Sequence, residues 1–292
     1  MVKEMFLVII VSTMLSVSAG GDIPTLSIYQ IQYTTNADGT SDWNTQKVNC
    51  EGGIVIHKWG GGRQRIVLYD PNNSSEWGGI LVKGENNTTP FDSINLGDWV
   101  SLDSVMVYDW LNKSRGNTIL YLDGTSTVIV LSTDNPLPEP LVVDVNDIAV
   151  VYDPVAESCY VTDHRAEKYE AMDIQVRDVT VGDIDVGKEL DNYSLNMSAD
   201  PNIYCWGSDY MNADKPSEAT YMPVVQPGQH FCSVSGIFEQ YTNIDYYWDY
   251  YQVLTTKEDD FVIEQPGDLD GDCDVDMADL AILAQYWLVG TK

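Results

Sequence analysis

The sequence predicts a mainly β protein with two β halves, followed by a short C-terminal calcium loop and helix. Short apolar runs between residues 25 and 264 are separated by Gly, Asn, Asp and Pro, and they show no long helical period. A proline-rich segment, 135–140, divides these runs, and an aspartate-rich repeat with helical apolar spacing follows over 267–289. We therefore expect units at 25–140, 141–264 and 267–289.

The N-terminal segment, residues 1–19, has the pattern of a secretory signal peptide. Lys3 precedes the apolar run Met5–Val17, and Val17, Ser18 and Ala19 supply small residues where a signal peptidase cleaves. The run is too short to span a bilayer as a mature helix, although a short membrane anchor is the open alternative. We expect a bacterial protein that is secreted, with no membrane span in the mature chain.

Charge and composition limit the partners. The chain has 45 acidic and 15 basic residues and a net charge of −30, which repels phosphate backbones and makes nucleic acid an unfavourable partner. Its 44% hydrophobic content, with 18 Tyr and 8 Trp, predicts a folded core. Five cysteines in an exported chain allow disulfides but leave at least one unpaired. We favour Cys205–Cys232, in the same half, with buried free thiols as the alternative.

The apolar runs define the expected strands on either side of a stiff connector, Asn135–Pro140, whose prolines restrict their own and the preceding residues. In the first half the expected strands are Ser27–Tyr33, Val48–His57, Arg65–Tyr69, Gly79–Val82, Trp99–Tyr108, Ile119–Tyr121 and Thr127–Leu131. In the second half they are Asp173–Val179, Asn202–Trp206, His230–Phe238 and Asp245–Val253.

The order of these segments resembles a known kind of module. The series includes Trp77–Val82 and Asn95–Val100 in the first half, then Tyr169–Val179 and Gly228–Gly236 in the second. It is similar to the OB-fold-like β-barrel modules of secreted bacterial proteins, including some extracellular nucleases. The resemblance covers residues 27 to about 263. It implies two OB-like barrels and specifies the fold better than the function.

The C-terminal repeat has the ligand spacing of an EF-hand calcium loop. Carboxylates occupy positions 1, 3, 5, 9 and 12, and position 7 contributes its backbone carbonyl. The predicted Ca²⁺ ligands are Asp268, Asp270, Asp272, Asp274, Asp276 and Asp279. Leu280, Leu283 and Trp287 then recur at helical spacing. The alternative is an acidic turn that caps a helix packed on the core.

This loop and helix resemble one repeat of a type I dockerin, which implies docking to a cohesin-like or cell-surface protein. Cys273 stands at position 6, where glycine is usual, so it must adopt a left-handed conformation or reshape the turn. Met277 and Ala278 stand where dockerins carry the pair that contacts the partner. One repeat is visible, whereas functional dockerins pair two.

Two further segments are candidate ligand sites. In 241–251, strand geometry places Tyr246, Trp248 and Tyr250 on one face, where aromatic rings can stack on the sugars of a polysaccharide or on unpaired bases. The alternative is packing in a barrel. The glycine-rich basic segment 57–65 contains three further candidates, for which a flexible hairpin tip is the alternative. They are Trp59, Arg63 and Arg65.

The sequence contains no recognisable catalytic motif. Its three histidines, His57, His164 and His230, are scattered, so we favour a protein that is not an enzyme. The favoured function is secreted, calcium-binding attachment to a partner or to polysaccharide. The alternatives are an extracellular nucleic-acid-binding or nuclease-accessory protein, a polysaccharide hydrolase component, and a purely structural surface protein.

Overall fold

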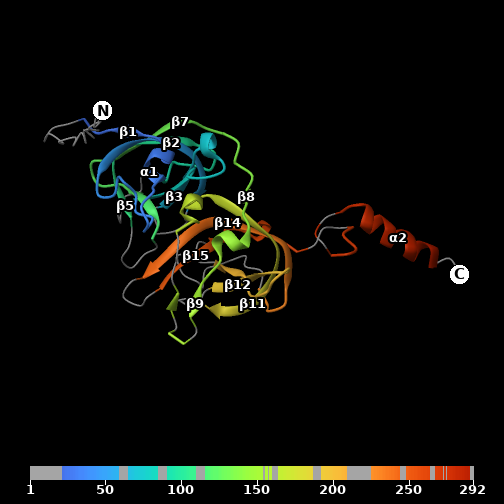
Figure 1. Ribbon diagram of the computed structural model, residues 1–292. Coiled ribbons are helices and arrows are strands. Elements are labelled where there is room, and N and C mark those ends of the chain that lie inside the picture. Colours follow the sequence, from blue (N-terminus) through green and yellow to red (C-terminus); the bar gives the residue numbers. More distant parts are fainter. Residues whose placement is uncertain are drawn as a thin grey trace, which may run out of the picture.

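In the computed structural model the chain forms two β-barrels and a separate C-terminal loop and helix (Figure 1). The structure describes residues 22–58, 65–84, 91–109, 116–153, 155–156, 158–159, 164–186, 192–208, 225–243, 248–263, 267–271, 273 and 275–289. The predicted signal peptide, 1–19, lies outside this part of the chain. Across the described ranges, no helix has the length and apolar character needed to cross a bilayer.

The first barrel closes by pairing five strands in a ring. In ring order they are β2 (Lys47–Lys58), β3 (Arg65–Tyr69), β4 (Gly79–Lys83), β6 (Thr118–Tyr121) and β5 (Trp99–Asp109), which returns to β2. β4 and β6 are parallel, and the other neighbours in the ring are antiparallel. Two strands extend this sheet, β1 (Thr25–Leu26) beside β2 and β7 (Thr127–Ser132) beside β5.

The second barrel repeats this order. Its ring strands are β11 (Asp173–Val186), β12 (Asn192–Met197), β13 (Tyr204–Ser208), β15 (Trp248–Leu254) and β14 (His230–Asn243), which returns to β11. β13 and β15 are the parallel pair. The edge strands are β8 (Leu141–Val142), β9 (Tyr152–Asp153), β10 (Ser158–Cys159) and β16 (Phe261–Val262). Strand order 1-2-3-5-4 closing on strand 1 is that of the OB fold, so the mainly β prediction with two OB-like halves is confirmed.

A glycine pair in β2 lets this strand pair with a neighbour on each of its two edges. Val48 and Cys50 are buried in the core, and the register of β2 against β5 then shifts between Cys50 and Gly53. Gly52 has φ +91°, and a side chain there would overlap the Val100 carbonyl. Such bulges bend a strand and increase its twist, so β2 can pair with both β3 and β5.

Several predicted elements differ from the structure. Residues Ser27–Tyr33 form no strand, because Ser27 and Gln30 make a reciprocal capping box that starts helix α1 (Ile28–Gln32). The helix buries Ile28 and Ile31, which lie on one face at helical spacing. β12 and the two-residue strands β1, β8, β9, β10 and β16 were not predicted, and β13 begins two residues later than expected.

The two barrels pack directly against each other. Val67, Leu81 and Ile119, on β3, β4 and β6, form one buried apolar cluster. Its members from the second half are Ala171, Ile237 and Leu254. Backbone hydrogen bonding adds to this contact, since the Trp77 N–H donates to the Lys168 carbonyl at 2.6 Å. The second barrel therefore covers the outer side of β3, β4 and β6.

The C-terminal helix α2 (Met277–Val289) projects away from both barrels (Figure 1). Its presence confirms the predicted helical period. However, Leu280, Leu283 and Trp287 are 51%, 46% and 72% exposed, so the helix is not packed on a core.

The predicted Cys205–Cys232 disulfide is wrong. Cys232 is bonded to Cys273 of the C-terminal loop. Cys205 points into the core of the second barrel, and β15 lies between its strand and β14, which carries Cys232. Cys50 and Cys205 are buried free thiols.

Candidate cation site and buried carboxylate cluster

Three of the predicted calcium ligands lie together. Asp268, Asp270 and Asp279 each offer a carboxylate oxygen, and these oxygens all lie within 4.8 Å of one another. Hard oxygen donors in such a group are what Ca²⁺ prefers, so the donor set fits this ion. Asp276 has another role here, because its Oδ1 accepts the Ala278 N–H at 2.6 Å in the first turn of α2. Asp272 and Asp274 lie outside the described residues.

Asp279 holds the two ends of the loop together. Its Oδ1 accepts the Leu269 N–H at 2.5 Å, and its Oδ2 accepts the Asp276 N–H at 2.7 Å. The side chain is buried although it belongs to an exposed helix. These backbone hydrogen bonds lower the pKa of Asp279, and the bond from Asp276 has the largest effect. The Asp279 carboxylate is therefore charged at neutral pH.

Asp268 holds the turn in the middle of the loop. Its Oδ1 accepts the Gly271 N–H at 2.8 Å, and its Oδ2 accepts the Cys273 N–H at 2.9 Å. Cys273 has φ +68°, so of the two outcomes expected for a non-glycine residue here, it adopts the left-handed conformation.

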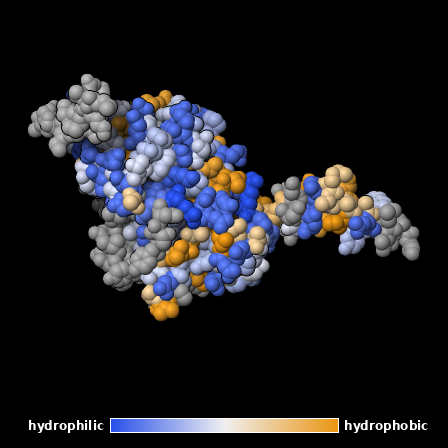
Figure 2. All heavy atoms as spheres, in the orientation of Figure 1, coloured by the Kyte–Doolittle hydropathy of each residue, from blue (hydrophilic) through white to orange (hydrophobic). Residues whose placement is uncertain are grey.

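Helix α2 presents an apolar surface to solvent. Met277 is 73% exposed, and Tyr286 is 74% exposed. Figure 2 shows hydrophobic residues on the projecting arm. Exposed apolar patches of this kind mark interaction sites in soluble proteins.

The predicted aromatic face is buried at Tyr250 and half-buried at Trp248. Tyr250 is 3% exposed, and its ring lies 4.4 Å from that of Trp206 and 5.0 Å from that of Tyr241. Trp248 is half-buried and stacks on Tyr152 of β9, because β10 pairs with β15 and places the β9–β10 hairpin over this face. Tyr250 therefore packs inside the barrel, which is the alternative that the sequence left open for this face. Tyr246 lies outside the described residues.

The basic segment is only partly described. Arg65 is half-buried in β3, where it pairs with Lys83 of β4, so it belongs to the sheet. Trp59 and Arg63 lie outside the described residues, and a ligand role for this segment stays a prediction.

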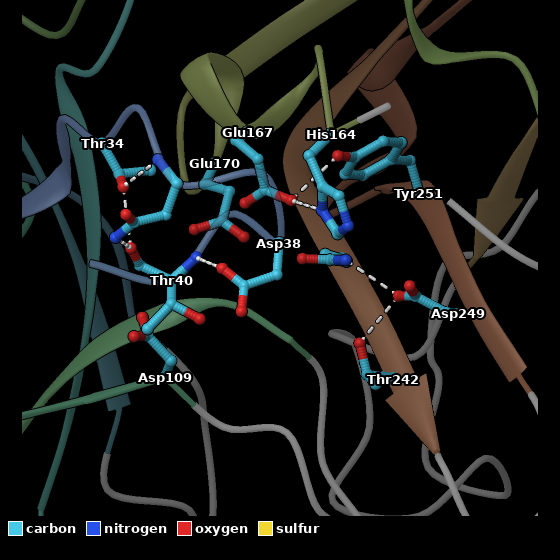
Figure 3. Close-up of polar contacts among 12 residues, drawn as sticks. Thr34, Asp38, Thr40, Asp109, His164, Glu167, Glu170, Thr242, Asp249 and Tyr251 are labelled. Atoms are coloured by element: carbon cyan, nitrogen blue, oxygen red, sulfur yellow. Dashed lines mark hydrogen bonds and ion pairs between the residues drawn. The ribbon is translucent and has the colours of Figure 1, made fainter. Parts of the chain in front are cut away.

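A carboxylate cluster that the sequence did not single out lies at the junction of the barrels (Figure 3). Glu167 Oε1 is 2.7 Å from His164 Nδ1 and accepts the Tyr251 hydroxyl at 2.9 Å. Glu170 Oε2 accepts the Thr118 N–H of the first barrel at 3.0 Å. The other oxygen of Glu170 is buried without a hydrogen-bond partner.

Burial raises the pKa of three carboxyls in this region. Burial is the main cause that raises the pKa of Glu170 well above its ordinary value. The negative charge of Glu167 raises this pKa further. Burial also raises the pKa of Asp109 to about 6 and that of Asp249. The hydrogen bond with Glu167 raises the pKa of His164. A protonated carboxyl can donate a hydrogen bond, which a carboxylate cannot.

This cluster does not form a glycosidase site. Glu167 and Glu170 are 5% and 3% exposed, so a sugar cannot reach between them. Neither the spacing nor the residue types could have indicated the cluster, because 45 acidic residues produce many such pairs by chance.

Comparisons with known proteins do not assign the chain to a family. No family model matches the chain, and no curated protein matches it. Among solved structures, an OB domain from Methanosarcina mazei is 17% identical, with a TM-score of 0.25, and the match covers 33% of this chain and 84% of that one. Fission yeast Pot1 with single-stranded DNA is 12% identical, with a TM-score of 0.29 and coverages of 82% and 88%. A Replication Protein A heterotrimer bound to single-stranded DNA is 9% identical, with a TM-score of 0.26 and coverages of 80% and 68%. The fold assignment rests on the strand order described above.

Proposed function

We propose that this protein is a calcium-binding attachment protein whose C-terminal loop binds Ca²⁺ and whose helix α2 contacts a partner. The observation that carries the proposal is the gathering of carboxylate oxygens from Asp268, Asp270 and Asp279 within 4.8 Å. Three carboxylates this close repel one another, and a divalent cation offsets that repulsion. Asp268, Asp270 and Asp279 would hold the ion, which supplies positive charge at the start of α2.

Support for attachment comes from the surface next to this site. Tyr286 and Trp287 are more than two-thirds exposed on a helix that projects from the barrels. Met277 and Ala278, at the dockerin-like contact positions, are also exposed. Because the chain carries a net charge of −30, a fitting partner has an apolar groove with a neutral or basic rim. Secretion and a cohesin-like partner belong to this proposal.

Calorimetric titration of the full chain with Ca²⁺ tests the site. We expect about one equivalent to bind to the wild type, as one EF-hand-type loop requires, and no binding to Asp268→Ala/Asp279→Ala. The matched control is Asp103→Ala/Asp134→Ala, which removes two exposed carboxylates from the first half and should bind as the wild type does. Absence of binding to the wild type, or full binding to the loop variant, would overturn the proposal.

The attachment role is tested by capture from an extracellular protein fraction. Tyr286→Ala/Trp287→Ala should lose a captured partner, and so should the wild type when Ca²⁺ is chelated. Capture that survives both changes would place the contact elsewhere on the molecule.

Nucleic-acid binding is the second candidate, and the strand order of the barrels is the observation that favours it. OB folds bind oligonucleotides on the face of their second and third strands. In the first barrel those strands are β3 and β4, whose outer residues Val67 and Leu81 pack against the second barrel. The net charge of −30 also opposes a phosphate backbone. This candidate is therefore restricted to the β12–β13 side of the second barrel.

Fluorescence anisotropy with a labelled single-stranded oligonucleotide tests this candidate. If the β12–β13 side binds the oligonucleotide, binding should be detectable at low salt. The logarithm of the binding constant should then fall linearly with the logarithm of the salt concentration. No change in anisotropy at low salt would eliminate it.

A further inference from the structure

We propose that the Cys232–Cys273 disulfide replaces the glycine of a calcium loop, so that the calcium affinity of the loop depends on the oxidation state of this bridge. The inference rests on the proposed function, because it concerns the regulation of the same site. It assigns a role to the one cysteine that lies among the loop ligands.

The bridge acts on the turn that positions Asp268. Cys273 has φ +68°, a conformation that costs a residue with a Cβ considerably more than it costs glycine. In this conformation its N–H donates to Asp268 Oδ2 at 2.9 Å. If Cys273 relaxed to an ordinary φ, this hydrogen bond would be lost. Asp268 would then be less firmly held beside Asp270 and Asp279.

The other end of the bridge lies in a rigid part of the molecule. Cys232 is 5% exposed in β14, between Phe231, which is fully buried, and Ser233, which pairs with Val262 of β16. β14 also pairs with β11 along much of its length. The bridge spans 41 residues and fixes Cys273 relative to this strand. It therefore restricts the conformations open to the loop before any ion binds.

Helix α2 does not provide this restraint. The hydrogen bonds of Asp268 and Asp279 go to the backbone of the loop itself, and α2 projects into solvent (Figure 1). The disulfide is thus a covalent tie from the loop to the second barrel. We infer that it compensates for the unfavourable left-handed conformation of Cys273.

Reduction reverses this compensation. A dithiol reductant breaks the S–S bond by transferring two electrons and two protons to the sulfurs, which gives the thiols of Cys232 and Cys273 and the cyclic disulfide of the reductant. Cys273 is then free to leave the left-handed region. Because linkage is reciprocal, Ca²⁺ bound to the loop must in turn favour the bridged form.

Two variants without the bridge separate the turn from the tether. Cys232→Ser/Cys273→Ser and Cys232→Ser/Cys273→Gly differ by one residue at position 6 of the loop. In Ca²⁺ titrations of the full chain, we expect the serine variant to bind roughly fivefold to thirtyfold more weakly than the oxidised wild type, the factor that corresponds to the left-handed cost. The glycine variant should regain most of this affinity, because glycine adopts the turn without a bridge.

Each result has a separate meaning. Equal, wild-type affinity in both variants would overturn this inference and leave the calcium proposal intact. Equally weak binding in both variants would overturn the replacement of glycine by the bridge, since the tether and not the turn would then govern affinity. A wild type that binds no Ca²⁺ would overturn both proposals.

A second readout does not use affinity. Reduction of the bridge by dithiothreitol, followed by mass spectrometry of the linked 232–273 peptides, should be slower in Ca²⁺ than in chelator. Equal rates would contradict the coupling. Cys50 and Cys205 are buried free thiols, and alkylation of unreduced protein measures their background reactivity.

Discussion

Replacing Asp109 by asparagine should stabilise the protein at alkaline pH. Asp109 ends β5 near the junction, where its Oδ1 accepts the Thr118 hydroxyl at 2.5 Å and its Oδ2 accepts the Ser41 N–H at 2.9 Å. Burial is the main cause that raises its pKa from 3.8 to about 6. A raised carboxyl pKa favours folding below the unfolded value of 3.8, and this contribution is lost as the pH rises through about 6.

The size of the effect follows from this pKa shift. A shift of roughly two pH units at about 1.4 kcal/mol per unit gives an upper limit of about 3 kcal/mol at pH 8. Asp109 is partly exposed, so solvent screening reduces this to about 1–2 kcal/mol. Asparagine keeps the shape, accepts from the Ser41 N–H and donates its amide to the Thr118 hydroxyl. The gain for Asp109→Asn should therefore be about 1–2 kcal/mol at pH 8 and close to zero at about pH 4.

Urea unfolding followed by tryptophan fluorescence, with chelator present throughout, measures this difference. Asp103→Asn is the matched control, because it makes the same charge change at an exposed position of the same strand and should not alter the pH dependence. If Asp109→Asn instead lost stability equally at pH 8 and pH 5, the carboxylate would be needed for its hydrogen bonds. The argument from burial would then be refuted.

Three other substitutions test the packing and the backbone. Tyr250→Ala should lower the free energy of unfolding in urea by about 3 kcal/mol or more, because it leaves a cavity beside buried rings. Leu131→Ala, at an exposed position, should lower it little. Similar losses of stability in the two variants would contradict the burial of Tyr250. Ser27→Ala should cost about 1 kcal/mol by removing the cap of α1, and an unchanged thermal midpoint would argue against that capping box. Gly52→Ala should lower soluble yield and the thermal midpoint sharply, since the new Cβ would overlap the Val100 carbonyl; a wild-type midpoint would rule out this bulge geometry.

The sequence by itself determined the features that depend on neighbours along the chain. Most strands were predicted within a few residues, because alternation and turn residues act over short distances. The loop spacing likewise predicted a group of six aspartates, of which Asp268, Asp270 and Asp279 lie together, and it left a left-handed Cys273 or a reshaped turn as the two outcomes. At Ser27–Tyr33 two local signals competed, and the capping box prevailed over alternation.

Tertiary structure decided what depends on residues far apart. The partner of Cys273 is 41 residues away, and Glu167 meets Tyr251 across 84 positions, so no spacing rule applies to either. The burial of Tyr250 was decided in the same way, because the rings of Trp206 and Tyr241 that lie against it belong to other strands. A strand pattern shows which side chains share a face. Whether that face meets water or another element is fixed only when the barrels close and pack.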